Sequence, residues 1–457
     1  MQAIEPIIQA IADAGGIAYR VGGCVRDQIL GVPNKDMDIE VYHLEASVLS
    51  KLLSRFGRVN EVGVSFGVIK LSMPHSEEID FTLPRRESKV GRGHRGFQVE
   101  VDHSMTVREA GLRRDFTINA IYQNAHNAQL LDPHGGIIDL YAKKLRATSE
   151  HFAEDPLRVL RGMQFAARFD ANLTPETAAM CRTLLQEYPT LAKERVWTEW
   201  SKWATKGTVP SKGLIALRDC DWLLNYPEIA NLQGVHQDPQ WHPEGDVWTH
   251  TLHVCDAAAK IAERERLNEF ERSVLLFSAL CHDMGKSTTS VFSDGRWRSP
   301  GHALAGVLLA SSFLQRIDCP IAISEMVLPL VAEHMVHFEA SVSFRTARRL
   351  SVRLGKASLV QLGRLVESDL SGRPPLPCQQ SVAMQQLLEL AQSLKIEHAR
   401  PSQLIQGRNL IELGYSPAPW FRKILDICYE AQLDGVFDCE TTGIDYLKRA
   451  LEELMSS

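Results

Sequence analysis

The order of hydrophobic and polar residues divides the chain into regions of two kinds. Residues 1–145 alternate short strand-like and helical stretches and contain many glycines. Residues 146–235 follow a helical pattern without a strong strand signal, and residues 244–375 are again helical and rich in histidine. This order predicts an α+β protein in which a small domain with a mixed sheet is followed by helical domains.

Polar segments that contain prolines mark the places where these regions meet. The loop 235–243 is polar and ends in a proline, and the stretch 372–377 contains three prolines. The residues after this second stretch are typical of a small helical tail. We therefore predict four domains, which span residues 1–145, 146–235, 236–375 and 376–457.

One alternating segment carries an acidic residue at every second position. Its apolar residues would face a core, so that Asp36, Asp38 and Glu40 share the other face of a strand. Two carboxylates at positions i and i+2 are able to hold Mg²⁺ together, as two-metal nucleotidyl transfer requires. Asp80 lies in a second alternating segment and is a candidate third carboxylate. The solvated acidic face of an edge strand is an alternative that the pattern leaves open.

The sequence before this strand is typical of a turn that leads into a helix. Adjacent glycines, Gly22 and Gly23, allow a bulky anion to approach the backbone, and the start of a helix adds amide donors. A pair of glycines taken alone also fits an ordinary turn. The pair becomes informative through its neighbours, Arg26 and Asp27, and through the acidic strand that follows.

Four ordered motifs resemble the class II tRNA nucleotidyltransferases and bacterial poly(A) polymerases, which belong to the polymerase-β-like superfamily. They are GGCVRD followed by DMD at 22–38, RRDFTINA at 113–120, GGIIDL at 135–140 and EDPLR at 154–158. The resemblance implies a polymerase-β-like head in which Asp36 and Asp38 are catalytic and hold Mg²⁺. It also implies a set of nucleotide-binding residues, namely Gly22, Gly23, Arg26, Arg114, Asp115, Asn119, Asp155, Arg158 and Arg161.

Two features bear on which nucleotide this family site selects. Gln164 stands where many relatives carry an arginine, and this departure concerns base selection rather than chemistry. The glycine-containing basic segment 85–111 lies where the family has a loop that is implied to help switch specificity from C to A.

The hydrogen-bonding chemistry of Asp155 and Arg158 also predicts a role in base selection. At positions i and i+3 of a helix they would project from one face. A carboxylate accepts hydrogen bonds and a guanidinium donates them. Cytosine and adenine each present an amino donor beside a ring-nitrogen acceptor, whereas uracil and guanine present a carbonyl beside an N–H. The pair is therefore predicted to accept C and A without a template. A surface ion pair is the alternative for these two residues alone.

The second half of the chain carries an ordered set of histidines and aspartates. The set comprises His250, His282, Asp283, His302, His334 and Asp369. It resembles the HD-domain phosphohydrolases, which are all-helical proteins that bind one or two divalent metals. The resemblance implies His250, His282, Asp283 and Asp369 as inner ligands, with His302 and His334 completing a second metal site. Imidazoles with carboxylates suit Ni²⁺, Mn²⁺, Fe or Zn²⁺ better than Mg²⁺ alone, and such a metal activates water.

Four other histidines are not assigned to this site. His253 is predicted to be a packed core residue, because it lies one turn from His250 among apolar neighbours. His236, His242 and His337 are predicted to be surface or loop residues.

Taken together, the motifs imply an enzyme that adds CCA to the 3′ end of tRNA from CTP and ATP, with Mg²⁺. The HD resemblance implies a second activity on phosphate esters, including 2′,3′-cyclic phosphates. A poly(A) polymerase or an enzyme that adds only CC or only A shares all four motifs and remains an alternative. A second alternative is an HD phosphohydrolase with a tRNA-binding head, although a binding module does not need paired carboxylates.

Net charge and composition bear on how the protein would bind RNA and on its location in the cell. The net charge of −6 means that an RNA-binding enzyme needs local basic surface. Two clusters are candidates, and solvated charged faces are an equal alternative for each: Arg85, Arg86, Lys89, Arg92 and Arg95, and Arg345, Arg348, Arg349, Arg353 and Lys356.

We expect a cytoplasmic protein, because the N-terminus does not follow a signal-peptide pattern and no apolar run is long enough to span a membrane. The oligomeric state is left open.

Overall fold

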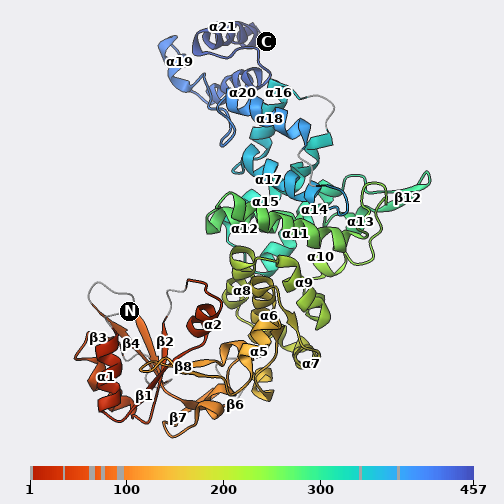
Figure 1. The fold of residues 1–457 in the computed structure, drawn as a ribbon. Helices are drawn as coiled ribbons and strands as arrows, with labels where there is room; N and C mark the ends of the chain where they lie inside the picture. Colours follow the sequence, from red (N-terminus) through yellow and green to blue (C-terminus); the bar gives the residue numbers. More distant parts are fainter. Residues whose placement is uncertain are drawn as a thin grey trace. The chain divides into compact units, whose positions relative to one another are not determined.

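The chain folds into two compact units, which are residues Met1–Asn225 and Tyr226–Ser457 (Figure 1). The structure is a computed structural model that describes residues 4–33, 37–60, 67–73, 78–89, 97–338, 342–377 and 381–456. The predicted metal ligand Asp36 lies outside these residues, as do the glycines of the predicted specificity loop at 91, 93 and 96. The two units divide before the predicted boundary at 235/236, and the four-domain division remains a prediction.

A seven-stranded mixed sheet forms the base of the first unit. Its order is β3-β4-β5-β2-β1-β8-β9. The strands are β1 (Ile17–Val21), β2 (Asp38–Tyr42), β3 (Arg58–Asn60), β4 (Val68–Ser72), β5 (Ile79–Thr82), β8 (Tyr122–Asn124) and β9 (Leu130–Leu131). Strands β2 and β5 are parallel, whereas the other neighbours are antiparallel. This sheet, followed by largely helical regions, confirms the predicted fold class.

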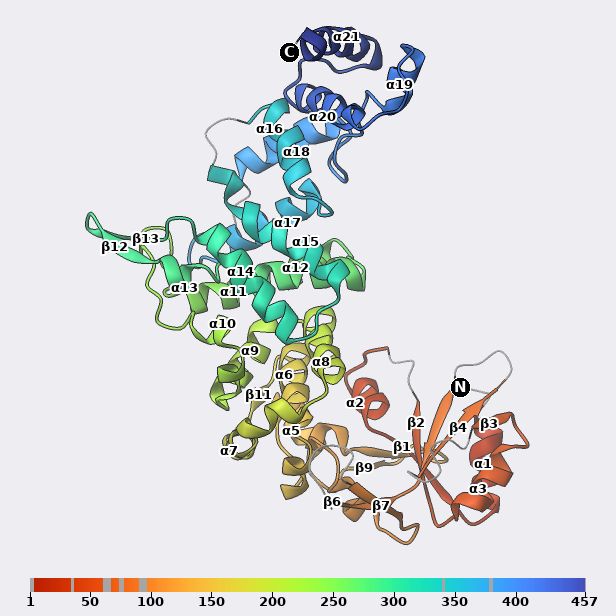
Figure 2. The ribbon, with the colours of Figure 1, turned by 180° about the vertical axis from the view of Figure 1, so that it is seen from behind.

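Helices α1 (Glu5–Asp13) and α3 (Ala46–Leu53) lie beside the sheet (Figure 2) and share its main apolar core. Ile39 and Val41 of β2 are fully buried in that core. Because side chains alternate along a strand, Asp38 at the start of β2 is directed to the other face. The predicted period-two pattern of this strand is therefore confirmed.

The remaining elements of the head are short and surround the sheet. They are α2 (Gly23–Ile29), β6 (Arg85–Lys89), β7 (Phe97–Val101), α4 (Val107–Gly111), the 3₁₀ turn η2 (Thr117–Asn119), α5 (Gly136–Tyr141) and β10 (Lys144–Leu145). Strands β6 and β7 pair with each other rather than with the main sheet.

Helices complete the first unit, as the sequence predicted. They are η3 (Glu150–Glu154), α6 (Leu157–Phe169), α7 (Pro175–Thr183), η4 (Leu185–Thr190), α8 (Lys193–Lys206), α9 (Pro210–Asp219) and η5 (Trp222–Asn225), with a two-residue strand β11 (Asn172–Leu173) paired to β10. Helix α6 packs against α8 and α9. Trp203 of α8 is fully buried and donates from its indole to the carbonyl of Pro210 at 2.9 Å, which ties α8 to α9.

The second unit is built almost entirely from helices. They are α10 (Pro227–Ala230), α11 (Val247–Arg264), α12 (Glu269–Cys281), α13 (Lys286–Thr289), α14 (His302–Arg316), α15 (Ile321–Glu333), η6 (His334–Phe338), α16 (Phe344–Arg353), α17 (Leu359–Ser371), α18 (Val382–Ser393), α19 (Gly407–Glu412), α20 (Trp420–Leu433) and α21 (Glu440–Ser456). Helix α11 packs against α12 and α17, and α15 packs against α12 and α14. The last three helices share a core of their own.

A β-hairpin interrupts this helical region, which the sequence analysis did not predict. Strands β12 (Val291–Ser293) and β13 (Arg296–Arg298) pair antiparallel and project from the helices in both views (Figures 1 and 2). The turn residues Asp294 and Gly295 both have positive φ, at 50° and 75°. Two-residue hairpin turns of this kind favour Asp-Gly, so the dipeptide was a usable signal.

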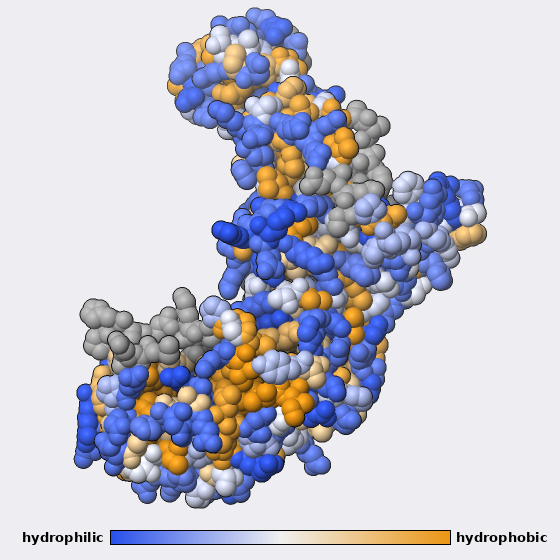
Figure 3. Space-filling model, viewed as in Figure 1, coloured by the Kyte–Doolittle hydropathy of each residue, from blue (hydrophilic) through white to orange (hydrophobic). Residues whose placement is uncertain are grey.

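Hydrophilic residues cover much of the face drawn in Figure 3, with hydrophobic patches between them. Within the described ranges, no helix has both the length and the apolar character needed to cross a membrane.

Candidate active sites

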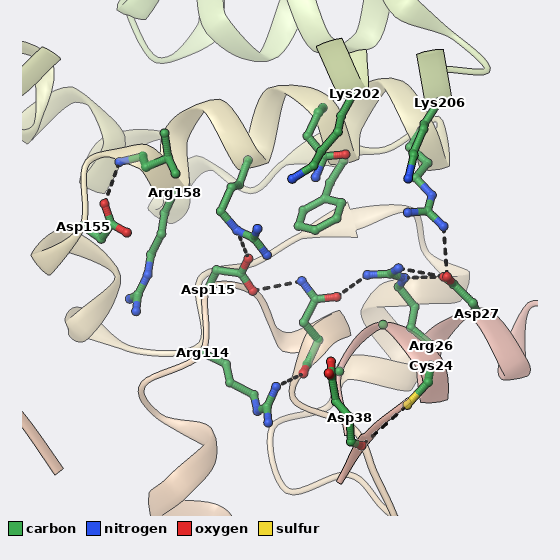
Figure 4. Close-up of a pocket in the computed structure, with 18 of the residues that line it drawn as sticks. Cys24, Arg26, Asp27, Asp38, Arg114, Asp115, Asp155, Arg158, Lys202 and Lys206 are labelled. Carbon is green, nitrogen blue, oxygen red and sulfur yellow. Dashed lines mark hydrogen bonds and ion pairs between the residues drawn. The ribbon is translucent and has the colours of Figure 1, made fainter. Parts of the chain in front are cut away.

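A cavity of 810 Å³ in the first unit brings together the predicted nucleotide-binding residues (Figure 4). Its lining includes all nine of them, which are Gly22, Gly23, Arg26, Arg114, Asp115, Asn119, Asp155, Arg158 and Arg161. Asp38 also lines it. Residues that are more than 130 positions apart in the sequence therefore meet in one hollow between the sheet domain and helices α6 and α8.

Asp38 is exposed at the first position of β2. Asp80 lies directly opposite it in the register of β5, but the Asp80 carboxylate pairs with Lys70 at 3.2 Å. Of the two predicted magnesium ligands, the described part of the chain includes Asp38, while Asp36 falls outside it. The assignment of both as ligands stays a prediction.

Glu40, on the same side of β2, has a different role from the solvated acidic residue that the strand pattern allowed. It is fully buried and accepts from Arg114 at 2.9 Å, from Arg113 at 3.1 Å and from the Tyr42 hydroxyl at 2.6 Å. Burial opposes ionisation, but the two arginines prevail and hold the pKa of Glu40 below its usual value. Glu40 thus fixes the position of Arg114 at the cavity.

Local geometry explains why glycine occupies position 22. Gly22 has a φ of 72°, a conformation that side-chain-bearing residues rarely adopt. A Cβ atom there would also lie 3.2 Å from a guanidinium nitrogen of Arg114. The turn into α2 therefore needs glycine both for its backbone and for the approach of Arg114.

Asp115 is the centre of a buried network in the cavity wall. Its carboxylate accepts from the backbone of Phe116 at 2.8 Å, from the Asn119 amide at 2.9 Å and from Arg161 at 2.7 Å. Although burial raises its pKa, the Arg161 charge and these bonds lower the pKa of Asp115 to about 2. Asn119 in turn accepts from the Arg26 guanidinium. The network joins α2, η2 and α6 into one wall.

Arg26 is enclosed rather than free to reach a ligand. Its side chain is 3% exposed, pairs with Asp27 at 2.7 Å and lies 4.5 Å from the ring centre of Phe169. Arg168 pairs with the other oxygen of Asp27 at 2.9 Å. Arg26 therefore shapes the cavity, and its guanidinium is already engaged by neighbours.

The pair Asp155 and Arg158 lines the cavity, but not from one helical face as predicted. Helix α6 begins at Leu157, and Asp155 is extended, with φ −120° and ψ 105°. The cause is Pro156, because the residue before a proline is disfavoured in helical conformation. The prediction of a shared helical face is therefore wrong.

The contacts of these two residues also differ from a surface ion pair. The Asp155 carboxylate accepts from the Leu157 backbone at 3.0 Å and from Arg195 at 3.0 Å. Arg158 donates to the carbonyls of His151 and Arg113, each at 2.6 Å. Each member of the pair is held in place by other groups at the cavity.

Sequence reasoning missed four further cations that line the cavity. They are Arg168, Arg195, Lys202 and Lys206. Lys202 and Lys206 lie four residues apart on α8 and are directed across the cavity from Asp38 (Figure 4). Eight cationic side chains face four aspartates in the lining, so the cavity suits a polyanion. The i,i+4 spacing of the two lysines was the available signal.

The basic cluster predicted at 345–356 is largely neutralised. Four of its members form ion pairs: Arg345–Asp434 (2.9 Å), Arg349–Asp434 (2.5 Å), Arg353–Glu333 (2.9 Å) and Lys356–Glu325 (2.6 Å). In the cluster at 85–95, Arg86 pairs with Asp102 at 3.1 Å, and positions 92 and 95 lie outside the described residues. For the cluster at 345–356, a solvated charged face is therefore the better interpretation.

All six predicted HD residues meet in the second unit. They form two groups of three possible ligands, His250 with His282 and Asp369, and Asp283 with His302 and His334. Within each group the ligand atoms lie within 4.8 Å of one another. Imidazoles and carboxylates in such a cluster are a donor set that fits divalent transition metals. These buried groups could therefore hold metal.

Backbone carbonyls fix the orientation of the imidazoles. The Nδ1 atoms of His282, His302 and His334 lie 2.7 to 2.8 Å from the carbonyls of Ala279, Ser299 and Val331. Each carbonyl requires a proton on Nδ1, which in a neutral imidazole leaves the Nε2 lone pair free and directed at its neighbours. This is the tautomer that a metal ligand needs.

Asp283 lies between the two groups. Its Oδ2 is 3.3 Å from Nε2 of His282 and 3.7 Å from Nε2 of His250. Its Oδ1 is 3.4 Å from Nε2 of His302 and 3.7 Å from Nε2 of His334, and it has no hydrogen-bond partner among the described residues. A buried carboxylate oxygen left unpaired in this way is costly unless a cation binds it.

Electrostatics keep these groups ready for a cation. Burial lowers the pKa of His302 to about 4, so that His302 is neutral near pH 7. For His250 burial acts in the same direction, but Asp369 and Glu244 outweigh it and raise its pKa to about 9. A positive charge is thus favoured between His250 and Asp369, whose Nε2 and Oδ1 atoms are 3.1 Å apart.

Glu244 and His242 are the residues that sequence reasoning missed here. Glu244 lies 2.8 Å from Nδ1 of His250 and 2.9 Å from Nδ1 of His242, and its pKa is lowered to about 2 against the effect of burial. His242 was predicted as a surface or loop residue. It does lie in a loop, but its side chain is only 16% exposed. The signal was the acidic residue six positions before the first ligand.

The prediction for His253 is wrong, because the structure places it on the exposed side of α11. His236 is an exposed loop residue, as predicted, and the side chain of residue 337 is outside the described part.

Comparison with known proteins matches two domain families to the chain. Residues 18–146 match the Poly A polymerase head domain family, and residues 247–382 match the HD domain family. A Multifunctional CCA protein of Methylobacillus flagellatus is 35% identical over 387 residues, which cover 82% of this chain and 89% of the relative.

Solved structures share the fold over almost the entire chain. The CCA-adding enzyme of Bacillus stearothermophilus in complex with CTP matches with a TM-score of 0.65 at 20% identity and covers 100% of this chain and 98% of its own. The CCA-adding enzyme of Thermotoga maritima complexed with tRNA has a TM-score of 0.59 at 17% identity and covers 98% and 95%. By its curated relative and its two domain matches, the chain belongs to the family of multifunctional CCA proteins, which are CCA tRNA nucleotidyltransferases with an HD phosphohydrolase domain.

Proposed function

We propose that the cavity of the first unit adds C, C and A to the 3′ end of tRNA from CTP and ATP. The observation that carries the proposal is the lining itself, in which Asp38 lies across a cationic cavity from Lys202 and Lys206. The similarity to a Multifunctional CCA protein supports CCA addition over poly(A) synthesis or partial addition. Named relatives of the same fold bind CTP and tRNA.

The cationic side chains have distinct tasks in this proposal. Arg114, fixed by Glu40, and the lysines of α8 neutralise the phosphates of the nucleotide and of the tRNA end. Mg²⁺ bound by Asp36 and Asp38 would neutralise the triphosphate and activate the terminal 3′-hydroxyl. The Asp115 network keeps the wall rigid, so that the reacting groups are held in place.

Base selection falls to Asp155 and Arg158. Arg195 positions the Asp155 carboxylate, and two carbonyls position the Arg158 guanidinium, which has five N–H groups and retains others for a base. The Asp155 carboxylate then accepts from the amino group of cytosine or adenine, and the Arg158 guanidinium donates to the ring nitrogen beside it.

Single-nucleotide incorporation tests this selection. A tRNA transcript that ends at its discriminator base, supplied with one nucleotide at a time, should take two C residues from CTP. A transcript that already ends in CC should take one A from ATP. Extension with UTP or GTP at rates close to that of CTP would contradict the assignment of Asp155 and Arg158.

We further propose that the HD site hydrolyses phosphate esters, including 2′,3′-cyclic phosphates, with Ni²⁺, Mn²⁺, Fe or Zn²⁺ or with Mg²⁺. A metal held by His250, His282, Asp283 and Asp369, with a second at His302 and His334, would supply an activated water. Asp283 joins the two groups because its two oxygens face different histidine pairs.

Metal depletion followed by addition of single metals tests this activity. Protein treated with a chelator should lose hydrolysis of adenosine 2′,3′-cyclic phosphate and recover it with one of the transition metals. Hydrolysis that persists at full rate in metal-free protein would contradict the proposal.

A further inference from the structure

A second cavity, of 260 Å³, opens beside the Asp283–His302–His334 group. The metal-site residues form one side of it. The other sides include two tryptophans and two arginines, which are Trp241, Trp297, Arg298 and Arg373. The HD assignment accounts for the histidines and aspartates, but it does not explain these four residues.

Arg373 is buried here, and no carboxylate among the described residues forms an ion pair with it. It is 8% exposed, and its Nε atom has no hydrogen-bond partner among the described residues. A buried guanidinium N–H that is left unpaired costs free energy, which an anionic ligand would recover. The preceding residue, Gly372, fixes the backbone, because a Cβ atom there would come within 2.4 Å of the Val254 side chain.

The other cation near the metal group is already engaged. Lys286 lies 2.7 Å from Asp283 and donates to Gln237 at 2.8 Å. Arg373 therefore remains as the buried cation available to a phosphate in this cavity.

Two tryptophan rings also line this cavity. The Trp297 ring packs on His236, with ring centres 5.1 Å apart and planes inclined by 34°, and its centre lies 5.4 Å from that of Phe292 in an edge-to-face arrangement. These contacts and the Asp294-Gly295 turn hold the ring at the cavity. Trp241, which also lines the cavity, is 51% exposed. Tryptophans of this kind provide stacking surfaces for nucleobases.

We infer that this cavity is a nucleotide subsite of the HD centre, in which Arg373 binds the phosphate of a terminal nucleotide and Trp297 and Trp241 contact its base. The inference rests on the proposed phosphohydrolase activity and assigns the residues beside the metal group that would bind the phosphate and the base of its substrate. Arg373 would bind the phosphate of any phosphate ester, whereas the tryptophans would contact only substrates that carry a base.

Two substrates separate these roles in the full-length, metal-loaded protein. Adenosine 2′,3′-cyclic phosphate carries a base, and glycerol 1,2-cyclic phosphate does not. Trp297→Leu should raise the KM for the adenosine substrate about tenfold and leave the glycerol substrate unchanged. Arg373→Gln should lower kcat/KM for both substrates at least about tenfold. Arg296→Gln, on the same hairpin but outside the cavity lining, is the charge control and should match the wild type.

Equal effects of Trp297→Leu on both substrates, or no effect on either, would overturn the inference, provided that metal content and near-ultraviolet circular dichroism match the wild type. Calorimetric binding of adenosine 2′-monophosphate is a readout that does not depend on turnover. Wild-type binding that both variants weaken supports the subsite even if no hydrolysis is seen, in which case only the proposed activity fails. Absence of binding by the metal-loaded wild type would overturn the subsite itself.

Discussion

The nucleotidyltransferase cavity and the HD site differ in which groups the fold holds in place. In the HD site the candidate metal ligands themselves are fixed, because backbone carbonyls bind Nδ1 of three histidines and leave Nε2 directed inward. In the nucleotidyltransferase cavity the arginines are fixed, by Glu40, Asp27, Asp115 and Asp155, while Asp38 lies exposed at the start of its strand.

This difference has a functional meaning. A preassembled, buried set of ligands suits a resident metal that remains bound between turnovers. An exposed carboxylate beside fixed cations suits Mg²⁺ that arrives with a triphosphate, since Mg²⁺ usually shares its ligands with substrate phosphates. The two sites should therefore be separable by mutation and by metal treatment.

The largest expected effect is a reciprocal loss of the two activities. Changing even an outer residue of a metal site typically costs tenfold to a hundredfold, so removing a direct ligand should cost at least about a hundredfold. Asp38→Ala should therefore abolish nucleotide addition and retain phosphoester hydrolysis, and Asp283→Ala should do the opposite. Rates of both reactions are measured for each variant. Asp318→Asn, an exposed left-handed position that asparagine tolerates, is the control.

A variant that lost both activities while retaining its folded spectrum would show that the sites depend on each other. That result would remove the functional separation argued above.

A second test concerns the residue behind the metal ligands. Glu244→Gln removes the charge that faces Nδ1 of His250 at 2.8 Å, and should weaken metal binding at the HD site by roughly tenfold to a hundredfold. Metal retained after dialysis against a graded chelator measures this affinity. Nucleotide addition serves as the internal control. Unchanged retention would mean that His250 is oriented sufficiently by the Gly372 carbonyl, 3.3 Å from the same nitrogen.

A smaller effect is expected where the first site selects its base. Arg195→Ala removes the partner of Asp155 at 3.0 Å, and a charge-assisted hydrogen bond of this type is worth about 1.5 kcal/mol or more. The preference for CTP over UTP should fall about tenfold, measured as the ratio of kcat/KM values. Lys193→Ala, an exposed residue of the same helix, should leave the ratio unchanged. If both variants kept full discrimination, Asp155 would not depend on Arg195.

A further effect concerns stability rather than rate, and it depends on pH. The pKa of Asp115 is about 2 in the fold, below its ordinary value of 3.8, so its ionised form favours the folded state by about 2 kcal/mol. This contribution is fully present above the unfolded pKa and is lost as the pH falls toward 2. Urea unfolding should show Asp115→Asn destabilised by about this amount at pH 7 and by about half of it at pH 3. A difference that is constant across this range would contradict the ionic origin.

Much of this architecture could be predicted from the sequence. The alternation of Ile39 and Val41 with acidic residues indicated a strand with one buried face, and the structure places both in the core. The order of His250, His282, Asp283 and Asp369 indicated one cluster, because it resembles the ligand order of the HD-domain phosphohydrolases. Short-range patterns and ordered motifs were sufficient for these features.

What could not be predicted depends on contacts between distant segments. Nothing local to Glu40 indicates that it would be buried against Arg114, or that Asp155 would pair with Arg195 forty residues away. Arg373 likewise lies in the proline-containing stretch 372–377, which was predicted only as a domain boundary. By contrast, Pro156 and the Asp294-Gly295 dipeptide were local signals that a closer examination of turn chemistry would have used.

The most direct test of the central claim is a gel assay with the purified chain, Mg²⁺ and a tRNA transcript that ends at its discriminator base. CTP and ATP are supplied separately and together, with an unrelated RNA in parallel. The account predicts addition of three nucleotides only when both are present, and only to tRNA. Long A tails on either RNA, or no extension at all, would contradict it.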